Sequence, residues 1–152
     1  MKFATVAFAF AGLAAPAFAQ DIEAGAKVFN QCQTCHVVVN EAGETLAGKN
    51  AKTGPNLYGV IGRVAGSYEG FKYGAGIEEL TTAGYVWTEA DLATYVQDPT
   101  KFLVEKTGDK KAKSKMAYKV KKPEDAANVA AFLASLAPAP AATDPAAAPV
   151  TN

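Results

Sequence analysis

The middle of this chain, residues 37–86, holds 10 of the 13 glycines of the sequence, and this limits how much regular structure can form there. Glycine loses more backbone freedom on folding than any other residue, so it weakens both helices and strands. We therefore predict a long, loop-rich centre flanked by helices. The chain has 152 residues, which is the size of one ordinary domain.

Three segments carry the signals of a helix. Residues 22–33 repeat small and apolar side chains at helical spacing, namely Gly25, Val28, Phe29 and Cys32. Residues 88–97 begin at Thr88, which can cap the first turn, and end before Pro99, since proline disfavours helix at the preceding residue. A third helix from Pro123 has an apolar face of Val129, Phe132, Leu133 and Leu136. Three short helices make a thin core, so we predict an all-α domain whose centre is filled by something besides side chains.

The sequence Cys32-Gln33-Thr34-Cys35-His36 supplies a candidate for that filling. C-x-x-C-H is the sequence at which haem is attached covalently. Two thiols at this spacing reach the two vinyl groups on one edge of the porphyrin, and the adjacent imidazole then points at the iron. The chain has 2 cysteines and 1 histidine, so any such chemistry depends on this motif.

Three other interpretations of the motif compete with haem: a zinc site, a thiol–disulfide redox pair and a structural disulfide. A structural zinc needs four protein ligands, and the sequence contains no further cysteine or histidine. A thioredoxin-like pair is expected within a βαβ pattern. Here a predicted helix precedes the motif and a glycine-rich loop follows it. The residues therefore favour haem.

The iron of such a haem needs a second axial ligand or keeps an open site. Met116 is the only methionine besides Met1, and lysines surround it, which is a poor neighbourhood for a core residue. Histidine and methionine together raise the reduction potential and fill both axial positions, which suits electron transfer. A methionine that merely covers the haem edge is the alternative.

Several further motifs resemble the class I cytochromes c, in particular the long soluble bacterial cytochrome c2 type. The resemblance spans residues 22–136 and rests, besides C-x-x-C-H, on residues 53–63 (TGPNLYGVIGR), 70–74 (GFKYG), 87–92 (WTEADL), 95–99 (YVQDP) and 114–116 (SKM). It implies the cytochrome c fold, in which short helices and long loops wrap round one haem. The first and last helices are then expected to cross, with Gly25 and Phe29 packed against Phe132.

The resemblance also implies roles for individual residues. Cys32 and Cys35 form the two thioether bonds to one haem c, His36 is the proximal axial ligand and Met116 the distal one. The carbonyl of Pro55 accepts a hydrogen bond from His36, which fixes the imidazole and raises its basicity. These residues form the expected cofactor and metal site.

Five more residues are expected round the haem. Tyr73 and Trp87 donate hydrogen bonds to a haem propionate, and Arg63 offsets its charge. Tyr95 lies on the methionine side, within hydrogen-bond reach of the sulfur, with Ser114 nearby. For the aromatic residues, an ordinary place in the core is the alternative, and for Arg63 it is a surface charge.

Charge is balanced over the whole chain, with 15 basic and 15 acidic side chains, but not locally. The stretch from Lys101 to Lys122 contains nine lysines and two acidic residues, a net charge of +7. The run flanks Met116, so we predict that it surrounds the haem edge and steers the acidic surfaces of redox partners, with Lys115 at its centre. A solvated lysine face is the alternative.

The first 19 residues have the pattern of a secretory signal peptide. Lys2 is followed by an apolar run from Phe3 and by Ala17-Phe18-Ala19, a small-residue cleavage site. We expect cleavage after Ala19 and a periplasmic protein, a membrane anchor being the alternative. The cytochrome domain then covers residues 20–136, and residues 137–152, rich in alanine and proline, form a disordered tail.

Together these features predict a soluble periplasmic monohaem cytochrome that carries single electrons between membrane complexes and has no enzymatic turnover. The subtype implies a bc1-type complex as donor and a reaction centre, terminal oxidase or denitrification enzyme as acceptor. We expect a monomer that binds no nucleic acid and does not insert stably into a membrane. The alternatives are a haem sensor or peroxidase-like enzyme with an unbound methionine, a cytochrome c′-like gas-binding protein and a thiol oxidoreductase.

Overall fold

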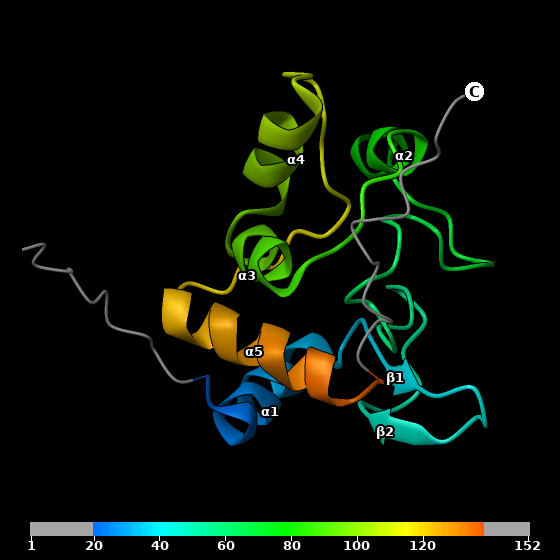
Figure 1. Cartoon of the computed structure of the whole chain (residues 1–152), viewed down its shortest axis with the longest axis vertical. Coiled ribbons are helices and arrows are strands. Elements are labelled where there is room, and N and C mark those ends of the chain that lie inside the picture. The colour runs from blue at the N-terminus through cyan, green and yellow to red at the C-terminus, as the bar shows by residue number, and fades with distance from the viewer. Residues whose placement is uncertain (1–19, 139–152) are drawn as a thin grey trace, which may run out of the picture.

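The computed structural model describes residues 20–138, which form five helices and one two-stranded hairpin (Figure 1). The elements in chain order are α1 (Ile22–Cys32), β1 (Val38–Val39), β2 (Thr45–Ala47), α2 (Ala75–Thr82), α3 (Glu89–Gln97), α4 (Pro99–Thr107) and α5 (Pro123–Ser135). None of these helices is long and apolar enough to cross a membrane. The predicted signal peptide and nearly all of the predicted tail lie outside the described residues.

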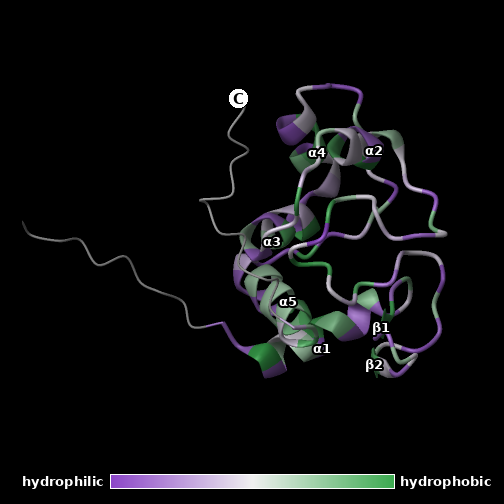
Figure 2. Ribbon diagram, turned by 45° about the vertical axis from the view of Figure 1, so that its right-hand side comes forward, coloured by the Kyte–Doolittle hydropathy of each residue, from purple (hydrophilic) through white to green (hydrophobic). Residues whose placement is uncertain are grey.

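Helices α1 and α5, the first and the last, cross and pack against each other, as predicted (Figure 1). Gly25 lies buried at the crossing, where a Cβ atom would stand 2.1 Å from the carbonyl oxygen of Asn128. One turn further along, the rings of Phe29 and Phe132 lie 5.6 Å apart. Figure 2 shows the largely hydrophobic character of α5. A glycine at the contact lets the two helices approach closely, and the phenylalanines fill the space beside it.

Helix α3 begins as predicted, because the hydroxyl of Thr88 accepts a hydrogen bond from the backbone N–H of Asp91 at 3.1 Å. Helix α4 follows at once, where no helix was predicted. Pro99 ends α3 but is itself the first residue of α4, a position that suits its fixed φ and missing N–H. The carboxylate of Asp98 caps the new helix by accepting from the N–H of Lys101 at 3.2 Å. The chain therefore turns a corner at Asp98 and stays helical.

The glycine-rich centre contains more regular structure than predicted. Strands β1 and β2 pair antiparallel, with Val38 opposite Ala47, and α2 forms within the supposed loop. Glycine belongs in α2 for a packing reason, since a Cβ on Gly76 would stand 2.9 Å from a methyl group of Leu103 in α4. The close approach of α2 and α4 compensates for the weak helix propensity of glycine.

A cluster of aromatic side chains joins α3 and α4 to the preceding loop. Trp87, which is 7% exposed, stacks on Phe102 with ring centres 5.5 Å apart and contacts Tyr95 edge-on at 5.0 Å. Tyr85 lies edge-on to the tryptophan at 5.9 Å. The part of the core between α3, α4 and the preceding loop is therefore largely aromatic.

Candidate functional site

The C-x-x-C-H motif forms a tight turn at the end of α1. The carbonyl of Cys32 accepts hydrogen bonds from the N–H groups of both Cys35 and His36, at 3.0 and 2.9 Å. Both cysteines are free thiols and partly buried. Burial, reinforced by Cys35, raises the pKa of Cys32 to about 11. The turn therefore places two thiols and one imidazole within five residues of a short, fixed segment.

His36 is held by the segment that follows the hairpin. Its Nδ1 lies 2.9 Å from the carbonyl oxygen of Pro55, and because a carbonyl can only accept, Nδ1 carries the proton. Nε2 is thereby left with a free lone pair. Burial lowers the pKa of His36, and the bond to Pro55 opposes that shift. The neutral imidazole is the form that binds a metal, so the predicted His36–Pro55 contact is present in the geometry that ligation requires.

Gly54 leaves the space in which the imidazole of His36 lies. The sequence analysis did not predict this role. A Cβ atom at Gly54 would stand 2.3 Å from Cε1, 2.6 Å from Nδ1 and 2.9 Å from Nε2 of His36. The φ angle of Gly54 is not in the left-handed region, so its glycine is required by space and not by backbone conformation. The signal in the sequence is the Gly54-Pro55 pair. Gly54 leaves space for the imidazole ring, and the adjacent Pro55 supplies the carbonyl that accepts its hydrogen bond.

Met116 is held by a segment that is distant from His36 in the chain. Its N–H donates to the hydroxyl of Ser114 at 3.0 Å, and that hydroxyl lies 2.9 Å from the hydroxyl of Tyr95. The methionine side chain is partly buried against the core. Burial raises the pKa of Tyr95, so the phenol keeps its proton. Tyr95 was expected within reach of the sulfur, but within residues 20–138 its hydrogen bond runs to Ser114, which in turn fixes the methionine backbone.

Arg63 points inward and braces a loop. Its Nη1 donates to the carbonyl of Tyr58 at 3.0 Å and its Nη2 to that of Asn56 at 2.9 Å. Burial lowers the pKa of the guanidinium. The nearby positive charge partly offsets the rise that burial causes in the pKa of Tyr73, so these two predicted propionate partners lie close together. Trp87, the third, sits in the aromatic cluster.

The residues fit a covalently held haem. The two thiols are free, one imidazole nitrogen is unprotonated, and a thioether is held on a separate segment. The missing Cβ of Gly54 keeps the ring of His36 unobstructed. A protein-only metal site finds no support in residues 20–138, where no group of three or more His, Cys, Asp and Glu side chains comes together. The donor set is thus that of a haem protein and not that of a zinc site.

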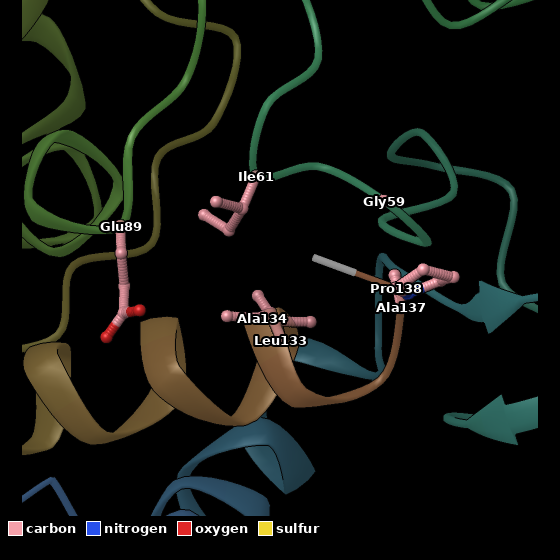
Figure 3. A pocket seen from close by; sticks show the side chains of 7 residues that line it. All are labelled: Gly59, Ile61, Glu89, Leu133, Ala134, Ala137 and Pro138. Carbon is pink, nitrogen blue, oxygen red and sulfur yellow. The ribbon is translucent and has the colours of Figure 1, made fainter. Parts of the chain in front are cut away.

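A separate pocket of about 350 Å³ opens between the loop at Gly59 and Ile61 and the end of α5 (Figure 3). Its walls are mostly apolar, and Glu89 borders it on one side. The Oε1 atom of Glu89 is buried and finds no hydrogen-bond partner within the described residues. None of the predicted site residues lines this pocket, so it is not the site of the chemistry described above.

Comparisons with known proteins agree with the fold and with a haem cofactor. The sequence profile of the cytochrome c family matches residues 22–137. Cytochrome c2 of Cereibacter sphaeroides is 57% identical over 145 residues, which cover 92% of this chain and 100% of that protein. Cytochrome c-550 of Paracoccus versutus is 52% identical over 130 residues, covering 83% of this chain and 82% of that protein. The crystal structure of cytochrome c2 from Rhodobacter sphaeroides matches with a TM-score of 0.74 and 59% identity, over 77% of this chain and 96% of that one.

These similarities confirm the predicted cytochrome c fold and the predicted cofactor. The free thiols of Cys32 and Cys35 stand at the C-x-x-C-H position, which in this family implies one covalently attached haem c. The matches cover between 82% and 100% of the length of the named relatives, so they concern the whole cytochrome domain. The chain therefore belongs to the cytochrome c family, as a class I bacterial member of the cytochrome c2 type that takes part in electron transfer.

Proposed function

We propose that this cytochrome is a periplasmic shuttle that carries single electrons between membrane redox complexes and catalyses no reaction of its own. A bc1-type complex is the proposed donor, and a reaction centre, terminal oxidase or denitrification enzyme the proposed acceptor. Cleavage after Ala19 is the proposed route to the periplasm. One observation carries the proposal: both residues able to ligate iron are held by hydrogen bonds, His36 through Nδ1 of its ring and Met116 through its backbone N–H.

The proposed mechanism assigns one task to each residue. Haem iron supplies a one-electron couple when bound. Cys32 and Cys35 would tether the group, and His36, oriented by Pro55, together with Met116, whose backbone is held by Ser114, would ligate its iron. Two protein ligands on the iron would leave a substrate no position to bind there. Such a site exchanges electrons with little rearrangement and favours transfer over catalysis.

Three further residues serve the proposed carboxylate end of the haem. The guanidinium of Arg63 is partly buried and anchored on two backbone carbonyls, so its charge cannot swing into solvent. We assign it to offsetting the propionate charge, with Tyr73 and Trp87 as hydrogen-bond donors. A charge held in a buried place acts more strongly on its neighbour than an exposed one, because less water screens it.

The lysine run from Lys101 to Lys122 is the proposed docking face. Three of its lysines form ion pairs, Lys101 with Glu105, Lys106 with Asp91 and Lys119 with Asp98. The ammonium of Lys115 donates to the carbonyl of Lys72 at 2.9 Å, which ties the methionine segment to the loop before α2. An ammonium has three donors, so Lys115 can still bind a partner's carboxylate while it holds this contact.

The axial ligation is tested by spectroscopy on the purified holoprotein. We expect sharp α and β bands when the protein is reduced and a weak sulfur-to-iron band in the near infrared when it is oxidised. Met116→Ala should abolish that band and lower the reduction potential by a sizeable part of the roughly 0.8 V range over which axial ligands tune haem. Ala117→Ser, at the next exposed position, should change neither property. A high-spin ferric spectrum in the unmodified protein would disprove ligation by Met116.

The docking face is tested by the rate of electron exchange with a bc1-type complex at low and high salt. Lys113→Glu reverses a charge inside the run and should slow the reaction at low salt by about threefold to tenfold, with a smaller effect at high salt. Lys115→Glu should slow it as well and should in addition loosen the contact with Lys72. Lys27→Glu makes the same change of charge on α1, outside the run. An equal loss of rate in the Lys27 variant would show that net charge matters and the lysine face does not.

A further inference from the structure

We propose that Asn56 is a positioning residue for the proximal ligand: its side chain holds the Pro55 carbonyl at the place where His36 can donate to it. The inference rests on the proposed role of His36 as an axial ligand. It adds a residue whose function is to set the strength of the hydrogen bond behind that ligand.

The segment that carries Pro55 lies along the C-x-x-C-H turn and is bonded to it on both sides of the proline. The N–H of Gly54 donates to the carbonyl of Cys35 at 2.7 Å, and the N–H of Leu57 donates to that of Val37 at 2.9 Å. Pro55 itself has no N–H and adds no bond of this kind. Its carbonyl is therefore placed entirely by its neighbours.

The side chain of Asn56 joins the Pro55 segment to strand β1, where Pro55 has no N–H to do so. Its Nδ2 donates to the carbonyl of Val39 at 2.7 Å, and its Oδ1 accepts from the N–H of Val39 at 3.0 Å. The carboxamide thus pairs with both polar groups of one residue of β1, in the manner of a neighbouring strand. Oδ1 also accepts from the N–H of Tyr58 at 3.0 Å. All three contacts are local to the Pro55 segment and the hairpin.

The backbone of Asn56 is held from the other side as well, since its carbonyl accepts from Arg63 at 2.9 Å. The carbonyl of Pro55 and the N–H of Asn56 belong to the same peptide unit, which is planar and rigid. A rotation of Asn56 therefore turns the Pro55 oxygen out of line with Nδ1 of His36. Side chain and backbone of Asn56 together fix the plane that carries the acceptor.

A consequence for the iron follows from the direction of this hydrogen bond. A carbonyl that accepts from Nδ1 raises the basicity of the imidazole, and a more basic ligand favours ferric iron. Loosening Asn56 should weaken the bond and shift the balance toward ferrous iron. A partial loss of this hydrogen bond should change the ratio of ferrous to ferric protein about threefold.

The test compares three variants of the holoprotein by redox titration and by NMR. Asn56→Ala removes all three side-chain contacts. Asn56→Ser keeps a hydroxyl that can accept from the N–H of Tyr58, as serine does in turns, but cannot reach Val39. The control is Asn40→Ala, which removes two hydrogen bonds to Glu44 within the same hairpin and does not touch the Pro55 segment.

Both Asn56 variants should raise the ferrous-to-ferric ratio about threefold at the wild-type midpoint, which is a shift of about 28 mV for one electron. The Nδ1 proton of His36 should exchange with solvent faster in both, and Asn40→Ala should change neither quantity. If Asn56→Ala does not accumulate with haem, Asn56→Ser decides the question. Potentials and exchange rates equal to those of the control would overturn the role of Asn56.

The same spectra separate a failure of this inference from a failure of the proposed function. If the ring protons of His36 show no paramagnetic shift in the oxidised wild type, His36 is not a ligand of the iron and both proposals fail. If those protons are shifted but the Asn56 variants behave like Asn40→Ala, the ligand assignment stands and only the role of Asn56 is lost.

Discussion

Gly54→Ala is expected to abolish the low-spin spectrum of most of the holoprotein. The new methyl group would stand 2.3 Å from Cε1 of His36, closer than real Cβ contacts permit. The backbone cannot easily retreat, because the N–H of Gly54 is bonded to the carbonyl of Cys35 at 2.7 Å. The imidazole must therefore turn and lose its bond to Pro55. Overpacking of this kind costs about 3 kcal/mol, which favours the displaced ring about a hundredfold.

The measurement is the absorption spectrum of the oxidised and reduced variant, together with its reduction potential. Gly59→Ala is the matched control in the same loop. Gly59 has a φ of +64° but nothing within 4 Å of a new Cβ, so alanine there strains the backbone by about 1 kcal/mol and leaves His36 alone. If the Gly54→Ala protein has an unchanged spectrum and reduction potential, the His36 ring does not depend on the absence of a Cβ atom at residue 54.

Gly25→Ala is expected to destabilise the folded protein by at least about 3 kcal/mol, through a clash between the first and last helices. The methyl group would meet the carbonyl oxygen of Asn128 at 2.1 Å and its carbonyl carbon at 2.6 Å. Both atoms belong to helix backbone, which cannot move aside as a side chain can. The helices must separate, and the contact between Phe29 and Phe132 loosens with them.

Denaturant unfolding of the holoprotein, followed by far-ultraviolet circular dichroism, measures this loss as a lower midpoint. Gly76→Ala provides a graded comparison, because its Cβ would meet a methyl group of Leu103 at 2.9 Å, the flexible end of a side chain. Alanine also gains about 1 kcal/mol of helix propensity over glycine, so Gly76→Ala should cost far less. Equal losses in the two variants would show that the helix crossing is not the tight point of the fold.

The elements that the sequence predicts well are those with local signals at both ends. Helix α3 has a capping threonine and a following proline, and α5 has Pro123 at its first turn with Glu124 and Asp125 behind it. Helices α2 and α4 were missed for different reasons. Pro99 was interpreted only as a stop, although Asp98 before it caps a new helix. Glycine at residue 76 argued against α2, because the contact with Leu103 that stabilises the helix comes from a distant segment.

The site shows the same division between local and distant information. The C-x-x-C-H motif and the resemblance it supports identified the haem, and the contact between His36 and Pro55 followed from the family pattern. The roles of Gly54 and Asn56 did not, because each depends on distances between segments about 20 residues apart. A pattern of residue types states which groups are present. It does not state which of them are close enough to exclude a methyl group.

The crossing of the first and last helices has a consequence for the order in which the protein is made. The N–H of Asp21 is bonded to the side chain of Asn128, and 107 residues separate them, so the fold cannot close until nearly the whole domain has been synthesised. Until then Cys32 ends a helix that has no partner, and Cys35 lies in the turn after it. Closing so long a loop is also slow. Chain order thus leaves an interval in which both cysteines are already present while α1 still lacks the helix it packs against.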